Sequence, residues 1–385
     1  MAALAELFDE TILLVPSYPR GGGAGEIMLS GDRLRVVPLS PPLGSGLSRK
    51  LLFPLWLVSV APTILKEFLR ADAMHAPVPG DVGTVGMLLA WVARKPMFVR
   101  HCGNWLHPRT LPEKFWRWFM ETFAGGRNLM LATGGAAGPP SQKNPKARWI
   151  FSTSLTQEEL QVYACVRTCP SGGQLRLIIV ARQDKKKGAA TVIQSLSLLI
   201  RRFPGVSLDI VGEGPAIPEF KQLALEAGVA ERVHFPGKLN HEQVMQRLRD
   251  AHLFVFPITS SDGFPKAVLE GLASGLPVVA TRVSVLPQLL GNGCGVLLDE
   301  ATPEAVARGI QQALTDPNRY HAMSRNAVET ARRYSLESWR DTIGGYLSAA
   351  WGPLRTEVGA PHALTDPVRY EQASSSGPHP QIFDP

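Results

Sequence analysis

Hydrophobic and polar positions follow a regular rhythm in the second half of the chain. Short apolar runs, typical of buried strands, alternate with segments in which apolar residues recur at helical spacing. The runs that predict strands cover residues 175–182, 206–214, 233–239, 252–258, 276–281 and 293–299. The segments that predict helices cover residues 188–204, 217–228, 241–251, 266–275 and 302–316. This alternation predicts a parallel, doubly wound sheet, whose ligands bind beyond the carboxyl ends of the strands.

The first half of the chain is also of α/β type, with a less regular pattern. Apolar runs predict strands at residues 11–16, near Val36, at 95–101 and at 128–135, and helices are predicted at residues 83–94 and 112–123. Residues 167–174 are rich in Gly, Pro and Ser and are typical of a linker. We therefore expect one domain over residues 1–168 and a second over residues 169–335, and we expect residues 352–385 to be a disordered tail.

The longest uncharged apolar segment runs from Leu51 to Leu65. It is shorter than the span of about 20 residues that crosses a bilayer, and it contains Pro54 and Pro62, so we expect no transmembrane helix here. A helix buried in the domain core is the favoured interpretation. The alternative is a segment at a membrane surface, with Trp56 inside it. Basic residues flank the segment on both sides: Lys50, Lys66 and Arg70.

Composition narrows the partners that the protein is expected to bind. The chain has 385 residues, of which 45% are hydrophobic and 19% charged, as in a globular protein of two domains. Its net charge of +7 favours anionic partners, either nucleotide phosphates, nucleic acid or an anionic membrane. Nucleic acid is not expected, because no basic stretch carries interleaved aromatic residues. The N-terminal segment is acidic rather than basic, so it does not resemble a signal peptide, and a cytoplasmic protein is expected.

The four cysteines of the chain do not indicate a metal site. Only Cys165 and Cys169 lie close together in sequence, and a zinc site usually needs a second pair of this kind. We therefore expect free thiols, as in a cytosolic protein.

Candidate chemistry gathers in loops that follow the predicted strands of the second half. In "ARQDKKKG", residues 181–188, Arg182 follows a strand and Lys187 precedes a helix, so this loop can hold a diphosphate. A solvated basic turn is the alternative. In residues 211–215, Gly212 and Gly214 would allow the backbone to approach a ligand closely, although ordinary strand-to-helix turns also use glycine.

A third loop carries two carboxylates that lie eight positions apart. Asp262 lies in the loop, and Glu270 lies inside the following helix, whose first turn at residues 264–266 is expected to offer free amides. A carboxylate on an apolar helix is costly to bury unless it is paired, which favours a binding role for Glu270. Glu270 could accept both hydroxyls of a ribose, and Asp262 could accept hydroxyls of another sugar. An exposed Asp and an ordinary helix-face Glu are the alternative.

These motifs resemble those of a known enzyme family. From about Leu175 to Trp351 the chain is similar to the C-terminal domain of the group 1 (family 4) retaining glycosyltransferases. The matching motifs are "ARQDKKKG", "DIVGEGP" and "FPITSSDGFPKAVLEGLASGLPVVAT". Residues 336–351 resemble the closing helix of the family, which packs back on the first domain. The resemblance implies the GT-B fold, in which two Rossmann-like domains face a cleft.

The resemblance extends more weakly to the first half. "VPSYPRGGGAG" is similar to the family's N-terminal glycine loop, and His101 falls where the family has a histidine beside the donor sugar. The segment between Gly25 and Arg33 is shorter than usual, so we expect a compact or truncated N-terminal domain. The family usually has Glu where this chain has Asp262. The resemblance implies catalytic roles for Arg182, Lys187, His101 and Asp262, and donor-binding roles for Glu270, Gly263, Phe264, Pro265, Lys266, Gly22, Gly23, Gly212 and Gly214.

The implied activity is hexosyl transfer with retention, from a nucleoside-diphosphate sugar to a glycan or lipid-linked acceptor in cell-envelope or exopolysaccharide synthesis. The chain contains no Asp-x-Asp triplet, which favours a site without metal, and no cofactor is expected beyond the nucleotide sugar itself. Peripheral contact with the cytoplasmic face of an anionic membrane would suit a lipid-linked acceptor. The alternatives are a non-catalytic nucleotide-sugar-binding protein, suggested by the short first domain, and an epimerase on a similar scaffold.

Overall fold

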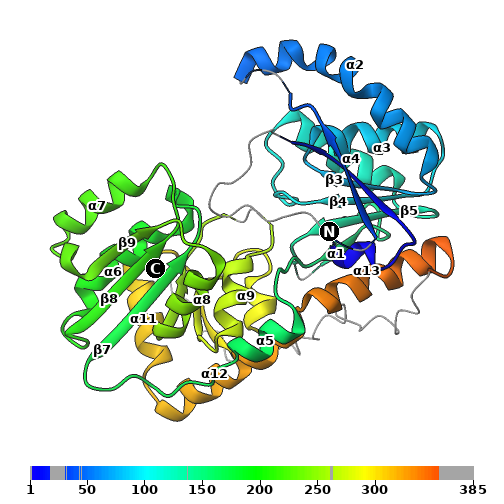
Figure 1. Cartoon of the computed structure of the whole chain (residues 1–385). Coiled ribbons are helices and arrows are strands. Elements are labelled where there is room, and N and C mark those ends of the chain that lie inside the picture. The colour runs from blue at the N-terminus through cyan, green and yellow to red at the C-terminus, as the bar shows by residue number, and fades with distance from the viewer. Residues whose placement is uncertain are drawn as a thin grey trace, which may run out of the picture.

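The computed structural model describes residues 2–17, 31, 33–42, 44, 46–136, 138–260 and 263–354. Three parallel sheets are present in this part of the chain, and helices cover them (Figure 1). The sheets belong to two lobes, which Figure 1 shows side by side. The N-terminal lobe carries α2, α3 and α4, and the C-terminal lobe carries α6 to α9 and α11.

The C-terminal lobe is built on a six-stranded sheet with the order β12-β11-β10-β7-β8-β9. Its strands are β7 (Gln174–Val180), β8 (Gly205–Val211), β9 (Val233–Gly237), β10 (Leu253–Phe256), β11 (Val278–Thr281) and β12 (Gly295–Leu298). Its helices are α6 (Ala189–Leu199), α7 (Ile217–Glu226), α8 (His241–Asp250), α9 (Lys266–Ala273), α10 (Leu286–Leu290), α11 (Pro303–Ala313) and α12 (Pro317–Arg332). Short 3-10 turns lie at Lys185–Lys187 (η1) and Ala230–Arg232 (η2). Every strand and helix predicted for this half has its counterpart, so the doubly wound sheet is confirmed.

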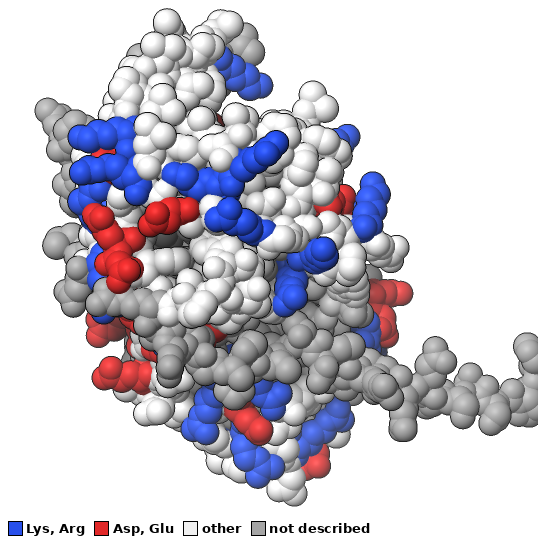
Figure 2. Space-filling view, turned by 90° about the vertical axis from the view of Figure 1, so that its right-hand side faces the viewer, with Lys and Arg blue, Asp and Glu red and all other residues white. Residues whose placement is uncertain are grey.

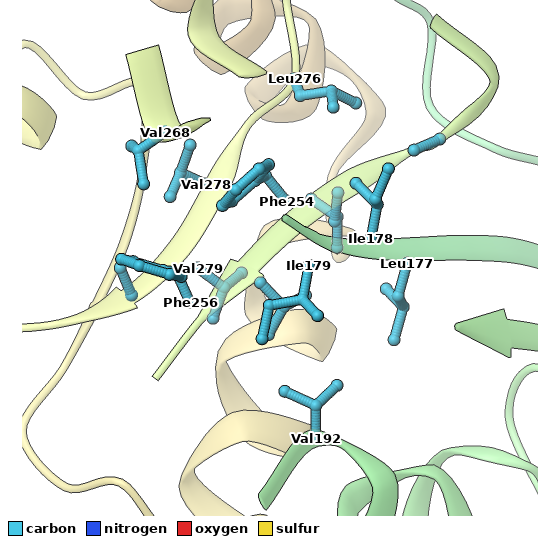
Figure 3. Close-up of a cluster of buried hydrophobic side chains, with 14 of the residues drawn as sticks. Leu177, Ile178, Ile179, Val192, Phe254, Phe256, Val268, Leu276, Val278 and Val279 are labelled. Atoms are coloured by element: carbon cyan, nitrogen blue, oxygen red, sulfur yellow. The ribbon is translucent and has the colours of Figure 1, made fainter. Parts of the chain in front are cut away.

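One hydrophobic core holds this lobe together. Figure 3 shows side chains of β7, β10 and β11 packed together, with Val192 of α6 below the strands in this view and Val268 of α9 above them. Strands buried on both faces are nearly continuous apolar runs, and this explains why the pattern predicted them well. α10 and α12 were not predicted, because the first is short and the second is mostly polar.

The N-terminal lobe has two smaller sheets. β1 (Thr11–Pro16) pairs with β2 (Leu34–Leu39), and a four-stranded sheet has the order β3-β4-β5-β6. The strands of the second sheet are β3 (Met74–Val78), β4 (Met97–His101), β5 (Asn128–Thr133) and β6 (Arg148–Ile150). The helices are α1 (Ala2–Ala5), α2 (Gly46–Arg70), α3 (Asp81–Val92), α4 (Leu111–Phe123) and α5 (Gln157–Tyr163). The strands and helices predicted for this half are confirmed, whereas β6 and α5 are too short to give a pattern.

The last helix of the described chain, α13 (Leu336–Trp351), returns to the N-terminal lobe. Its buried residues Trp339, Ile343 and Leu347 pack with Phe98 and Leu131 of the four-stranded sheet. This is the packing that the resemblance implies for the closing helix. The division of the chain into domains at residues 168 and 335 remains our proposal, and the predicted tail after residue 354 lies outside the described residues.

The expectation for the apolar segment near Leu51 needs correction. The segment is part of a 25-residue helix, α2, that continues to Arg70, because Pro54 and Pro62 do not end it. Its stretch Ser48–Arg70 is long and apolar enough to cross a membrane by length and composition, and only 28% of the apolar window is buried. The favoured interpretation as a buried core helix therefore holds for one face alone. On the opposite face large apolar side chains are exposed: Leu51, Leu55, Val58, Leu65 and Leu69.

The membrane interpretation placed Trp56 in a segment at the membrane surface, and for this residue it was wrong. Trp56 lies on the buried face of α2 with Val60 and Ile64, and its indole Nε1 donates to the Ser40 carbonyl at 2.7 Å. The exposed face consists of aliphatic side chains instead.

Candidate active site

The carboxyl ends of β7, β8 and β9 open onto a pocket of about 650 Å³ beside α9. The pocket brings together loops that are far apart in sequence, as expected for the strand ends of a doubly wound sheet. Its lining includes Arg182, the segment 211–215, Lys238 and Leu239 after β9, Val244 of α8 and Ala267 of α9. Two of the three predicted loops thus contribute directly to one pocket.

The two predicted cationic side chains of the first loop line different pockets. Arg182 lines the large pocket, whereas Lys187 lines a smaller pocket together with Gly263, Phe264 and Pro265. Between them, the Asp184 carboxylate accepts from the Lys186 amide at 3.0 Å and fixes the turn η1. Arg182 and Lys187 therefore line different pockets, and Lys187 lies just before α6, where helix amides add positive potential.

Gly188 fixes the position where this loop enters α6. Its φ is +83°, and an added Cβ would lie 2.6 Å from the Pro257 carbonyl oxygen. Only glycine fits such a position without strain.

The second loop packs tightly against the first. A Cβ on Gly212 would lie 2.0 Å from the Ala181 carbonyl oxygen, and a Cβ on Gly214 would lie 2.0 Å from that of Gln183. Both glycines border the large pocket, but their absent side chains make room for the first loop rather than for a ligand. The close approach to a ligand that the sequence suggested is thus not the main reason for glycine at these positions.

Gln183 is a residue that sequence reasoning missed. Its side chain is fully buried, and Nε2 donates to the carbonyls of Ala181 and Val211 at 2.8 Å each. These carbonyls lie at the ends of neighbouring strands, so Gln183 holds together the two loops that border the pocket. A polar residue at the end of an apolar run was the only signal that could have indicated it.

Glu270 lies where the pattern predicted, inside α9 and mostly buried, with 14% of its side chain exposed. Burial raises the pKa of this carboxyl group, and the positive charges of His241 and Lys266 partly oppose the effect. Among the described residues, its one ion-pair partner is His241, whose Nδ1 lies 3.9 Å from Oε1. The carboxylate is thus largely removed from water without a close donor, which is costly unless a ligand supplies one.

The start of α9 was expected to offer free amides at residues 264–266, and one of these amides is not free. The amide of Lys266 donates to the Phe264 carbonyl at 3.1 Å and is therefore not free. The Phe264 ring packs between the rings of Phe151 and Tyr334, at centroid distances of 6.2 and 5.8 Å. Phe264 thus also joins the C-terminal lobe to the N-terminal one.

His101 lies at the carboxyl end of β4, as predicted, and is almost fully buried at 1% exposure. Burial lowers its pKa to about 4, so the imidazole is neutral at pH 7. The Gly103 amide donates to Nδ1 at 3.3 Å, which leaves Nε2 to carry the proton. His101 can therefore act as a neutral hydrogen-bond donor.

The two lobes approach each other beside His101. A Cβ on Gly263 would lie 3.7 Å from the carbonyl oxygens of Cys102, Gly103 and Thr133. The loop that precedes α9 thus lies against the strand ends of the N-terminal sheet. Asp262, Gly22 and Gly23 lie outside the described residues, so their predicted roles remain predictions.

Comparison with known proteins agrees with this geometry. Residues 170–330 match the sequence model of the family described as "Glycosyl transferases group 1". This part of the chain is therefore similar in sequence to the group 1 glycosyltransferases. Over 171 residues the chain is 29% identical to the GDP-mannose-dependent alpha-(1-6)-phosphatidylinositol monomannoside mannosyltransferase of Mycolicibacterium smegmatis, covering 43% of this chain and 44% of that protein. It is 33% identical over 187 residues to the D-inositol 3-phosphate glycosyltransferase of Segniliparus rotundus, covering 47% and 41%. The matched segment therefore spans less than half the length of these relatives.

Solved structures extend the likeness to both lobes. Sucrose-phosphate synthase from Thermosynechococcus elongatus aligns with a TM-score of 0.64 at 16% identity, covering 89% of each chain. HepE from Anabaena in complex with UDP aligns with a TM-score of 0.63 at 19% identity, covering 88% of this chain and 99% of that one. At such identities the likeness shows the fold, and that fold is GT-B, as expected.

Proposed function

We propose that the protein is a retaining glycosyltransferase that moves a sugar from a nucleoside-diphosphate sugar to a glycan or lipid-linked acceptor. One observation carries the proposal. Arg182 lines a pocket of nucleotide size, Lys187 faces the space next to it, and the buried Glu270 carboxylate lies one helical turn from Ala267 in the pocket wall. Cations beside a carboxylate that has no close donor among the described residues suit a ligand with both phosphates and hydroxyls.

Each group has a role in this proposal. Arg182 and Lys187 bind the diphosphate, and Glu270 accepts hydrogen bonds from the ribose hydroxyls. The aligned HepE structure is a complex with UDP, which is consistent with a nucleotide in such a fold. Asp262 would accept from hydroxyls of the transferred sugar, and His101 would donate from Nε2 to the same sugar.

The chemistry follows from the charges. As the bond between the anomeric carbon and the phosphate oxygen breaks, negative charge grows on the leaving diphosphate, and Arg182 and Lys187 stabilise it. The acceptor hydroxyl attacks from the same face, and its proton passes to the departing phosphate oxygen, so that configuration is retained. In this proposal no carboxylate acts as a covalent nucleophile. Cationic side chains supply the stabilisation that a metal ion gives in other transferases, and a metal-free reaction remains part of the proposal.

A lipid-linked acceptor of the cell envelope is the acceptor that we propose. One relative is named for action on a phosphatidylinositol mannoside and another for action on an inositol phosphate. The exposed aliphatic face of α2 supports contact with a membrane surface. Figure 2 shows the top of the molecule, where α2 lies, almost free of charged side chains, with Lys and Arg gathered below it. We propose a cytoplasmic protein that binds the membrane face peripherally.

An assay of sugar release and transfer tests this function. Purified protein is incubated with UDP-glucose or GDP-mannose, with and without a phosphatidylinositol mannoside acceptor, and the products are analysed by mass spectrometry and NMR. Transfer or slow donor hydrolysis, with retained configuration in the transfer product, is expected. Tight nucleotide binding without any turnover would instead favour the non-catalytic nucleotide-sugar-binding protein. An inverted product would contradict the retaining mechanism.

A further inference from the structure

The first residue of α8, His241, lies beside Glu270 but belongs to no predicted motif. His241 Nδ1 is 3.9 Å from Glu270 Oε1, and 43% of the His241 side chain is exposed. The imidazole can therefore be reached by a ligand, whereas only 14% of the Glu270 side chain is exposed. The distance is that of an ion pair and is too long for a direct hydrogen bond.

The backbone position of His241 is fixed by the local sequence. α8 begins with a capping box, in which Asn240 Oδ1 accepts from the Gln243 amide at 2.9 Å and Gln243 Oε1 accepts from the Asn240 amide at 3.0 Å. The ring of Tyr163, on α5, stands edge-on to the imidazole at 6.0 Å. The capping box thus positions the backbone of His241, and Tyr163 contacts its ring. Such support is expected of a residue with a binding role.

The pair of His241 and Glu270 borders the large pocket. Val244 lies about one helical turn after His241 on α8, and Ala267 lies about one turn before Glu270 on α9. Both Val244 and Ala267 line the pocket of about 650 Å³. The pair therefore lies at the rim of the pocket, between the two helices that form this wall.

Other charged groups near Glu270 do not replace His241. Lys266, on α9, also lowers the pKa of Glu270, and Glu159, on α5, raises it. The Lys266 side chain is exposed, whereas most of the Glu270 side chain is buried. Glu159 caps α5 by accepting from the Thr156 amide at 2.8 Å. Among the described residues, His241 is thus the one donor within ion-pair distance of the buried carboxylate.

A single hydroxyl group fits between the two side chains. An oxygen about 2.7 Å from a carboxylate oxygen and about 2.9 Å from an imidazole nitrogen makes two ordinary hydrogen bonds. Two atoms 3.9 Å apart can both be reached by such an oxygen, which donates to Glu270 and accepts from Nδ1–H of His241. Neither side chain alone recognises both the donor and the acceptor capacity of a hydroxyl.

We infer that His241 is a positioning residue for the donor nucleotide, and that it holds one ribose hydroxyl jointly with Glu270. The inference rests on the proposed function, because it requires a nucleotide in the large pocket. It adds a specificity determinant: the site distinguishes ribose from deoxyribose through two side chains on different helices.

The test compares nucleotides that differ in one hydroxyl. Binding of UDP, GDP, ADP and CDP to the full chain is measured by calorimetry, and then binding of the 2′-deoxy and 3′-deoxy forms of whichever nucleotide binds. His241→Ala is expected to weaken binding of the ribonucleotide about three- to tenfold, the range of one hydrogen bond. It should also reduce the extra loss that one of the two deoxy forms causes in the wild type, because only the hydrogen bond to Glu270 remains. His241→Asn, which keeps a donor, should recover part of the affinity.

The control variant is His234→Ala, which removes another exposed histidine of the same lobe and should leave nucleotide binding unchanged. Melting temperatures of all variants show that each one folds. If His241→Ala binds the ribonucleotide as tightly as the wild type, or retains the full discrimination against both deoxy forms, the inference fails while the proposed function stands. If the wild type binds none of the four nucleotides, the proposed function and the inference fail together.

Discussion

The two lobes of this protein are built from the same kinds of element but differ in how continuously their sheets and hydrophobic cores are built. The C-terminal lobe has one continuous six-stranded sheet and one large core, and the family match falls on it. In its described residues the N-terminal lobe has two separate sheets, three smaller hydrophobic clusters and a long helix with an exposed apolar face. Yet aligned structures cover both lobes at low identity.

The difference shows which contacts constrain the shape of the candidate site. In the C-terminal lobe the loops around the pocket contact each other at backbone distance, so glycines at 188, 212 and 214 cannot be replaced without moving a carbonyl. In the N-terminal lobe Gly138 has open space around its Cβ position. The loops around the pocket are therefore held in a fixed shape.

The largest expected effect is on catalysis, through the cation in the pocket. Arg182→Ala should lower kcat by about 10²- to 10³-fold, the loss expected when one group that stabilises charge in the transition state is removed. Lys185→Ala is the matched control, because Lys185 lies on the same loop but pairs with Glu219 at 2.7 Å. Equal losses in both variants would mean that the loop acts by net charge alone, contrary to the role given to Arg182.

A second expected effect concerns stability and separates the two lobes directly. Gly214→Ala should lower the free energy of unfolding by about 1–3 kcal/mol, because the new methyl group overlaps the Gln183 carbonyl. Gly138→Ala, in the N-terminal lobe, should change it by less than about 0.5 kcal/mol. Chemical denaturation of both variants measures the difference, and a stable Gly214→Ala would show that the two loops are not packed as described.

A third expected effect concerns the surface of the N-terminal lobe. Leu55→Glu combined with Val58→Glu places charges on the exposed face of α2, and we expect about a tenfold weaker partition onto anionic lipid vesicles. Leu225→Glu, at an exposed leucine of α7 in the other lobe, is the control and should not change it. Cosedimentation with vesicles measures the partition. No binding by the wild type would remove the membrane from the proposal without affecting the donor site.

The smallest expected effect is a pH dependence that arises from His101. Because burial lowers its pKa to about 4 from the ordinary 6.5, the unfolded chain binds more protons than the folded one between these values. Stability is therefore fully present above pH 6.5 and falls as the pH is lowered towards 4. At about pH 5.5 this residue should account for a loss of about 1 kcal/mol.

His101→Asn tests the origin of that loss. The variant should lose about 1 kcal/mol less stability than the wild type between about pH 7 and 5.5, whatever its stability at neutral pH. His234→Asn, at an exposed position, should behave like the wild type. An unchanged pH dependence in His101→Asn would mean that His101 is not buried as described.

The fold was predictable to the extent that burial leaves a local pattern. Strands such as β7 and β10 are largely apolar because the sheet is covered on both faces, and the helices between them carry apolar residues at helical spacing. β6 and α5 escaped prediction, because a strand of three residues and a helix of seven are too short for a period to appear. The exposed face of α2 escaped it for another reason: an apolar run does not reveal which of its side chains finds a partner.

The candidate site divides in the same way. Glu270 was predicted because a carboxylate on an apolar helix is unusual, and Arg182 because it follows a strand in a basic loop. His101 was predicted from the family resemblance alone. Gln183 and His241 were not predicted, since each acts through a contact with residues that are distant in sequence: Val211 for Gln183 and Glu270 for His241. Such pairings depend on the three-dimensional arrangement of the helices and strands.

The central claim, that the pocket beside Arg182 and Glu270 binds a nucleoside-diphosphate sugar, is tested most directly by a thermal-shift panel. The full chain is heated alone and with each of UDP-glucose, GDP-mannose and other nucleotide sugars. We predict that at least one donor raises Tm of the wild type, and that Arg182→Ala and Glu270→Ala lose this stabilisation while Lys185→Ala keeps it. A wild type whose Tm does not respond to any nucleotide sugar would contradict the account.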